Sequence, residues 1–135
     1  MRRSTNATLA ALAIAAGSLM FGAPTASAAA YCDSSGYTAT SEPMERCTSL
    51  SNGILTIHQG GSGVMTTQYY KSGGSGISAS LGYSRSGTTH YKAAVSISSG
   101  QTKNASWSLG ADAYCSNIIG LMNSGSTYQT PTSHC

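Results

Sequence analysis

Residues 77–109 read ISASLGYSRSGTTHYKAAVSISSGQTKNASWSL, and apolar and polar residues alternate through three segments of this stretch. In a β-strand every second side chain lies on the same face, so this alternation places one face in a core and the other in water. The stretch therefore predicts three antiparallel strands joined by two polar turns. The residues expected to face the core are Ile77, Ala79, Leu81 and Tyr83, then Tyr91, Ala93, Val95 and Ile97, and finally Ala105, Trp107 and Leu109.

Similar strand patterns lie on both sides of this stretch. Residues 53–58 (GILTIH) and 64–71 (VMTTQYYK) predict two further strands, separated by the glycine-rich turn 59–63. Residues 117–122 (NIIGLM) are apolar on both faces, as expected of a central strand that is covered on both sides. Residues 126–130 predict a last edge strand, which the proline that follows would end.

Together these segments give about seven short strands at spacings of roughly 8–12 residues, without a convincing helix. We therefore expect an all-β fold, a small antiparallel immunoglobulin-like β-sandwich, with a small closed β-barrel as the alternative. Residues 29–52 show no clean alternation and are interpreted as a lead-in tied by a disulfide. Within this lead-in, residues 42–50 could form a short helical turn.

A shorter motif supports the sandwich. Val95 and Ile97 end one expected strand, Gly100 and Gln101 form a turn, and Trp107 is the inward aromatic residue of the next strand. This spacing resembles that of bacterial immunoglobulin-like modules, and the resemblance implies the same fold here.

The first 28 residues have the three-part pattern of a secretory signal peptide. Arg2 and Arg3 form a basic start, residues 7–21 are apolar, and residues 26–28 (ASA) form a small-residue cleavage site. The apolar run is too short for a stable membrane span. We expect a secreted protein that has no membrane association after removal of residues 1–28 and that consists of a single domain, residues 29–135.

The expected mature chain contains four cysteines, an even number in an exported protein, which implies two disulfides in an oxidising compartment. Three pairings are possible. We favour Cys32–Cys47 with Cys115–Cys135, because each bond then closes a local loop at one end of the domain. Each such loop stabilises the fold by roughly 3 kcal/mol on the chain-entropy model. The cysteines lack the Cys-x-x-Cys spacing of zinc sites, so we expect no metal.

Charge and composition narrow the classes of function. After removal of residues 1–28, five basic and four acidic residues remain, so no basic stripe is left to neutralise a nucleic acid backbone. No Gly-x-Ser-x-Gly nucleophile elbow is present, and the glycine runs lack the Gly-Lys-Ser/Thr of phosphate-binding loops. The sequence therefore predicts no catalytic residues and no cofactor, although a catalytic protein remains the third alternative.

Tyrosine is the residue type that points to binding. All eight tyrosines lie in the expected mature chain, flanked by Ser, Gly and Asn, a composition typical of adaptable recognition surfaces. The adjacent tyrosines at positions 69 and 70 must point to opposite faces of a strand. Filling a core that is poor in aliphatic residues is the competing explanation for these tyrosines. The candidate binding residues are Tyr69, Tyr70, Tyr83, Arg85, Tyr31 and Tyr37.

Several segments resemble small secreted β-sandwich proteins of filamentous actinobacteria: SNGILTI (51–57), GYSRSGTTHY (82–91), SGQTKNASW (99–107) and the YQTP ending (128–131). The chain is similar in particular to the adaptor component of umbrella toxin particles. That resemblance implies a connector between a lectin-like subunit and the stalk of a large antibacterial toxin. It implies no catalytic residue.

Two functional hypotheses follow. In the first, the protein is an adaptor that binds protein partners, with an edge strand or the segment 31–45 adding to a partner's sheet and a tyrosine face holding the stalk. In the second, it inhibits an extracellular hydrolase through an exposed loop, residues 83–86 (YSRS).

Overall fold

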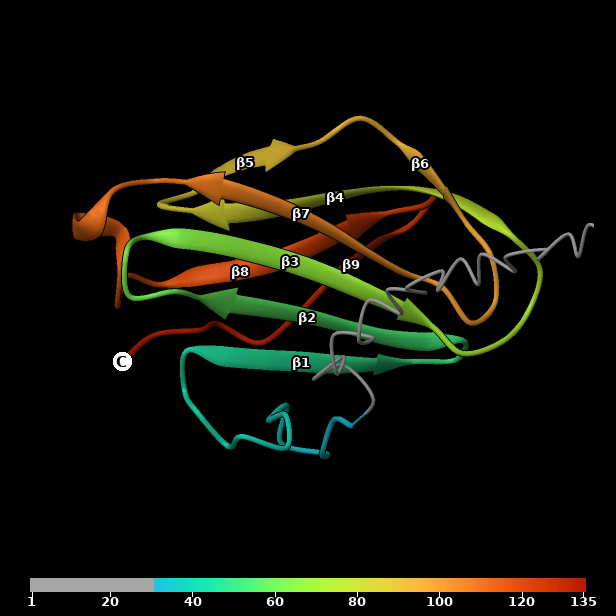
Figure 1. Ribbon diagram of the computed structural model, residues 1–135, viewed down its shortest axis with the longest axis horizontal. Coiled ribbons are helices and arrows are strands. Elements are labelled where there is room, and N and C mark those ends of the chain that lie inside the picture. The colour runs from blue at the N-terminus through green and yellow to red at the C-terminus, as the bar shows by residue number, and fades with distance from the viewer. Residues whose placement is uncertain (1–30) are drawn as a thin grey trace, which may run out of the picture.

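The computed structural model describes residues 31–135, so the expected signal peptide lies outside the described residues (Figure 1). Nine strands and one short 3-10 turn, Ala111–Ala113, form two antiparallel sheets whose inner faces share one core. The predicted antiparallel β-sandwich with two disulfides is confirmed.

The first sheet contains four strands in the order β1-β2-β3-β7. Two consecutive hairpins join the first three strands, whereas β7 comes from later in the chain and pairs with β3. The predicted turn at residues 98–101 therefore leads from one sheet to the other instead of joining neighbouring strands. The bounds are β1 Glu45–Leu50, β2 Gly53–Gln59, β3 Val64–Lys71 and β7 Thr102–Ser108.

The second sheet has the order β5-β4-β8-β9, and β6 pairs with the same long strand β4 that holds β5. The central position of β8, predicted from its two apolar faces, is confirmed. The bounds are β4 Ile77–Arg85, β5 Thr88–Tyr91, β6 Val95–Ile97, β8 Ile118–Asn123 and β9 Thr127–Gln129.

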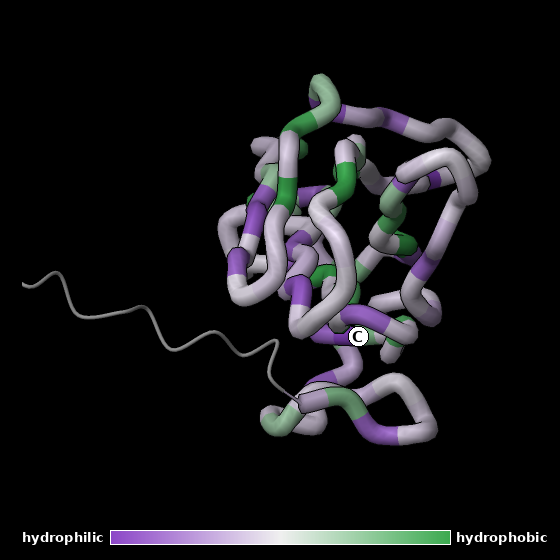
Figure 2. The backbone as a smooth tube through the Cα atoms, turned by 90° about the vertical axis from the view of Figure 1, so that its right-hand side faces the viewer, coloured by the Kyte–Doolittle hydropathy of each residue, from purple (hydrophilic) through white to green (hydrophobic). Residues whose placement is uncertain are grey.

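The strand β1 corrects the expectation of a helical turn at residues 42–50. It pairs along its whole length with β2, and its other edge forms a bridge between Arg46 and Tyr37 of the lead-in. Hydrogen bonds to two neighbouring segments hold it extended, so tertiary pairing decides its conformation rather than an apolar alternation. The part of the lead-in before β1, residues 31–44, forms a lobe beside β1 and next to the C terminus (Figure 2).

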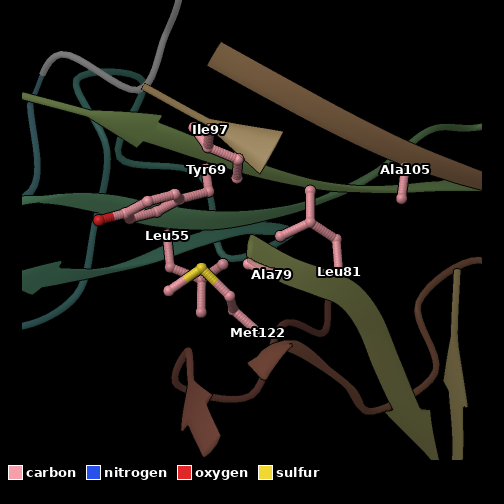
Figure 3. Close-up of a cluster of buried hydrophobic side chains, with 7 residues drawn as sticks. All are labelled: Leu55, Tyr69, Ala79, Leu81, Ile97, Ala105 and Met122. Carbon is pink, nitrogen blue, oxygen red and sulfur yellow. The ribbon is translucent and has the colours of Figure 1, made fainter. Parts of the chain in front are cut away.

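The core is divided into two clusters along the sandwich. One is shown in Figure 3 and combines side chains of both sheets, with Met122 of β8 lying beside Leu55 of the opposite sheet. The other surrounds Ile57 and Tyr83. A buried hydroxyl also links the sheets, because Thr67 of β3 donates to the carbonyl oxygen of Gly82 in β4 at 2.7 Å.

The two sheets approach closely where Gly120 of β8 faces Ile57 of β2. A Cβ atom at Gly120 would lie 2.8 Å from Cβ of Ile57 and 3.2 Å from a methyl carbon of Thr130. Real Cβ atoms do not approach so closely, so the glycine is required for the spacing of the sheets at this point.

Both favoured disulfides are confirmed. Cys32–Cys47 ties the lead-in to β1, and Cys115–Cys135 ties the connection after β7 to the last residue. These bonds indicate an oxidising extracellular environment. Within residues 31–135, no helix has the length and apolar character needed to cross a bilayer.

Replacing Gly120 with Ala should lower the free energy of unfolding by about 1–3 kcal/mol, because the added methyl group overpacks the contact with Ile57. Urea denaturation with the disulfides intact measures the change. Gly61→Ala is the control, because nothing lies within 4 Å of its Cβ position. Equal stability of the two variants would contradict the close approach of the sheets.

Candidate functional site

The two lateral sides of the sandwich differ in construction. The sheet orders place β1 and β9 at one side and β7 with β5 and β6 at the other. We refer to these as the β1/β9 side and the β5/β7 side. A cavity at one end of the sandwich is the third feature that can bind a ligand.

Arg46 organises the β1/β9 side. Its guanidinium lies 4.1 Å from the ring centroid of Tyr37 and donates to the carbonyl oxygens of Gly36 at 2.9 Å, Ser35 at 2.8 Å and Thr132 at 3.3 Å. One planar cation thus connects the lead-in, β1 and the C-terminal segment. The lead-in is consequently a fixed structure on the surface of the sandwich.

The C-terminal segment closes the same side with buried polar contacts. Gln59 of β2 is 2% exposed, and its amide nitrogen donates to the carbonyl oxygens of Ser116 and Ser133 and contacts the Ser133 hydroxyl at 2.7 Å. Across the sandwich, the Thr48 hydroxyl of β1 donates to the carbonyl oxygen of Gln129 in β9 at 3.0 Å. Side-chain hydrogen bonds therefore join both sheets along this side.

A one-residue bulge shapes the β5/β7 side. Tyr91 is paired with Gly82, and Val95 is paired with Ala79. Residues 92–94 on the edge therefore lie opposite residues 80–81 of β4, so the edge carries one extra residue. Within residues 92–94 the bulge shifts the alternation of inward and outward side chains by one residue. It also divides the single strand expected there into β5 and β6.

The bulge corrects the predicted faces. His90 shares the inner face with its partner Tyr83, whereas Tyr91 lies on the outer face and is 40% exposed. The expectation that Tyr91 packs inward is therefore wrong, and His90 remains exposed although it stacks on Tyr83. Ile97 is buried as predicted, and Val95 faces inward at the rim but remains 40% exposed.

Aromatic rings and a cation line the inner rim of this side. The Tyr83 ring stacks on His90 with centroids 4.9 Å apart and meets Trp107 edge-on at the same distance. The Lys92 ammonium lies 5.4 Å from the Trp107 centroid. These contacts hold β5 and β7 together through rings, and the part-exposed Trp107 and the exposed Lys92 remain accessible to a partner.

The six predicted binding residues do not form one site. Tyr31 is 55% exposed at the start of the lead-in, and Tyr37 is half-buried against Arg46. As predicted from their adjacency, Tyr69 and Tyr70 point to opposite faces, with Tyr69 buried and Tyr70 half-buried.

Two of the six belong to the core. Tyr69 is 3% and Tyr83 is 5% exposed, which confirms the inward position predicted for Tyr83 and leaves neither ring as an exposed binding surface. Tyr83 and Arg85 lie within β4, so the loop expected at residues 83–86 is the end of a strand and its turn.

The end cavity has a volume of about 340 Å³ and is bounded by the β1–β2 turn, the ends of β3 and β8 and the start of β4. Lys71, the last residue of β3, lies on the same inward face of the strand as Met65, Thr67 and Tyr69. This face therefore continues into the cavity. Lys71 is 1% exposed, and its ammonium donates to the carbonyl oxygen of Gly73.

Tyr69 borders the same cavity. Burial raises the pKa of its hydroxyl above the ordinary 10.0, and the nearby Tyr128 contributes in the same direction. In Figure 3 this hydroxyl points away from the other labelled side chains. At neutral pH the group is therefore a protonated hydrogen-bond donor.

Sequence reasoning missed the residues that define these features: Arg46, Lys71, Tyr91 and Val95. Lys71 had a readable signal, because a lysine stands at an inward position of the alternation. The role of Arg46 depends on carbonyl groups of Gly36 and Thr132, and a local sequence pattern cannot predict contacts with such distant residues.

Among the residues that the structure describes, no group of three or more His, Cys, Asp or Glu side chains is arranged to hold a metal ion. Comparisons of the chain with protein-family models, curated proteins and solved structures found no match. The geometry of the described residues is thus the basis for a functional proposal.

Replacing Arg46 with Ala should lower the free energy of unfolding by about 1–3 kcal/mol, because carbonyl oxygens of three residues lose a charged donor. Hydrogen exchange of residues 33–37 should accelerate. Arg85→Ala, at the part-exposed end of β4, is the control and should change stability by less than about 0.5 kcal/mol. Unchanged exchange in the lead-in of the Arg46 variant would refute its organising role.

The raised pKa of Tyr69 predicts a loss of stability in alkali. Because the folded state holds this proton more tightly than the unfolded chain, the contribution is complete below pH 10.0 and falls as the pH rises through the higher folded value. Phenolate absorbance at 295 nm, compared between the native protein and Tyr69→Phe, should show one component that titrates above pH 10.0. A difference centred at or below pH 10.0 would contradict the burial of the hydroxyl.

Proposed function

We propose that this protein is a secreted, non-enzymatic binding module that joins two protein partners through its two opposite lateral sides. The observation that carries the proposal is the distribution of its exposed large hydrophobic side chains. Tyr31 and Tyr128 lie at the β1/β9 side, whereas Tyr91 and Val95 lie at the β5/β7 side. Exposed aromatic and aliphatic side chains of this kind are typical anchors of protein interfaces.

The lead-in suits recognition on the β1/β9 side. The Cys32–Cys47 bond and the contacts of Arg46 fix its conformation before any partner binds. Preorganisation lowers the conformational entropy lost on binding, which favours affinity from a small surface. Tyr31, at the start of the fixed segment, is the most exposed large hydrophobic residue described.

The β5/β7 side suits strand addition. All four residues of β5 are exposed, and the next residues as far as Ser96 are exposed as well. An edge strand presents unpaired backbone groups that can hydrogen-bond to a strand of a partner. The bulge between Tyr91 and Val95 limits such pairing to short segments and so discourages uncontrolled edge-to-edge association.

The proposed setting is extracellular. The signal-peptide pattern of residues 1–28 and the two disulfides support export. In this setting we further propose that the partners are the lectin-like subunit and the stalk of an antibacterial toxin complex, which the sequence resemblance suggests. A connector between two subunits needs two separate surfaces, and the lateral sides supply them.

Matched tyrosine variants test the proposal. Protein carrying an affinity tag after Cys135 is used to capture partners from the culture supernatant of the source organism. We expect the native protein to retain a lectin-like chain and a long repeat-containing chain. Tyr31→Ala should weaken retention of one of them at least about tenfold and Tyr91→Ala that of the other, since buried interface tyrosines are common hot spots.

Thermal unfolding of each variant provides the folding control. Retention of a single hydrolase in equimolar amount would replace the connector with an inhibitor. Loss of the same partner from both variants would show that one surface, rather than two, does the binding. Turnover of a substrate by the purified protein would overturn the non-enzymatic assignment.

A further inference from the structure

The end cavity contains a charged group without an acidic neighbour in its lining. None of the described residues around the cavity is acidic, yet Lys71 is 1% exposed. Burial of an ammonium group costs free energy unless a counter-charge and hydrogen-bond acceptors surround it. The carbonyl oxygen of Gly73 accepts one of the three N–H bonds of Lys71. An anion placed in the cavity would supply the missing charge.

The remaining polar lining also favours an anion. Tyr69 and Tyr128 bring hydroxyl groups to the cavity, and Asn52 and Ser124 lie at its border. The raised pKa of Tyr69 keeps its hydroxyl protonated at neutral pH, so it can donate to an oxygen anion. Hydroxyl and ammonium donors around one space are the groups that a carboxylate requires.

The other part of the lining is apolar. Leu50, Ile77 and Met122 contribute hydrocarbon and thioether surface, and Leu50 and Ile77 also pack against the core cluster of Figure 3. A free inorganic ion would leave this surface without a partner. The volume of about 340 Å³ lies within the range of small-molecule sites.

We propose that the cavity binds a small amphipathic carboxylate, with the carboxylate at the Lys71 ammonium and an aliphatic or aromatic tail against Leu50, Ile77 and Met122. The cavity shares Tyr128 with the β1/β9 side, but its lining contains neither Tyr31 nor Tyr91, the two residues whose substitution tests the connector. Small-molecule binding and partner binding can therefore fail or succeed independently.

Octanoate is the probe, and octanol, octylamine, acetate and inorganic phosphate are the comparison ligands. Two-dimensional NMR of the disulfide-intact protein locates the binding, and titration calorimetry gives the affinity. We expect octanoate to shift the resonances of residues 50, 69, 71, 77 and 122. It should bind at least about tenfold more tightly than octanol, octylamine, acetate or phosphate, because only octanoate satisfies both halves of the lining.

Variants separate the role of the charge from that of the shape. Lys71→Met keeps the length of the side chain and removes the charge, and should weaken octanoate binding at least about tenfold. Lys92→Met, on the distant β5/β7 side, is the matched control and should bind octanoate like the native protein. Should Lys71→Met unfold, Ile77→Phe provides the second test, because it fills the apolar part and should weaken octanoate binding with Lys71 intact.

Several results would overturn the proposal. These are octanol binding as tightly as octanoate, acetate or phosphate binding equally well, and resonance shifts on the outer faces only. Undiminished octanoate affinity in Lys71→Met would also contradict it. Partner capture by the same Lys71 variant reports on the connector alone, so a failed site and a failed connector give different results.

Discussion

The buried contact between Gln59 and the C-terminal segment is the interaction on which the arrangement of the two sheets depends. The amide nitrogen of Gln59 in β2 reaches the backbone and hydroxyl of Ser133, which is bridged to Ile118 of β8. The Thr130 hydroxyl, a few residues earlier, accepts from the backbone N–H of Gly120. Because large aliphatic residues are few, these polar links and the Cys115–Cys135 bond replace part of the missing apolar area.

These polar links lie on one side of the sandwich, so the two lateral sides are held together differently. The β1/β9 side is closed by the C-terminal segment, by Arg46 and by the Thr48 bond to β9. The β5/β7 side is held by aromatic contacts around Tyr83 and Trp107, and its edge strands remain exposed. A rigid side and an open side offer a partner different kinds of recognition, one by a preformed surface and one by strand addition.

Local patterns were sufficient for much of this fold. The alternation from Ile77 to Tyr83 and the local cysteine spacing predicted the long strand β4 and both disulfides, because these depend on nearby residues. The strand β1 escaped prediction since its apolar content is low and its partners come from elsewhere in the chain. The reversal of faces after Tyr91 depends on one extra residue in the pairing with β4, which only the register reveals. The alternation placed Tyr83 correctly in the core, whereas Tyr69 could not be placed, because tyrosine serves equally in this core and on a surface.

Residue-resolved hydrogen exchange of the disulfide-intact protein tests the asymmetry most directly. The backbone amides of Gly120, Thr130 and Ser133 are hydrogen-bonded beneath the closed side, whereas residues 93–96 lie on the exposed edge. The account predicts exchange of the first group at least about a hundredfold slower than that of the second. Equal rates, or faster exchange at Thr130 and Ser133 than at residues 93–96, would contradict it.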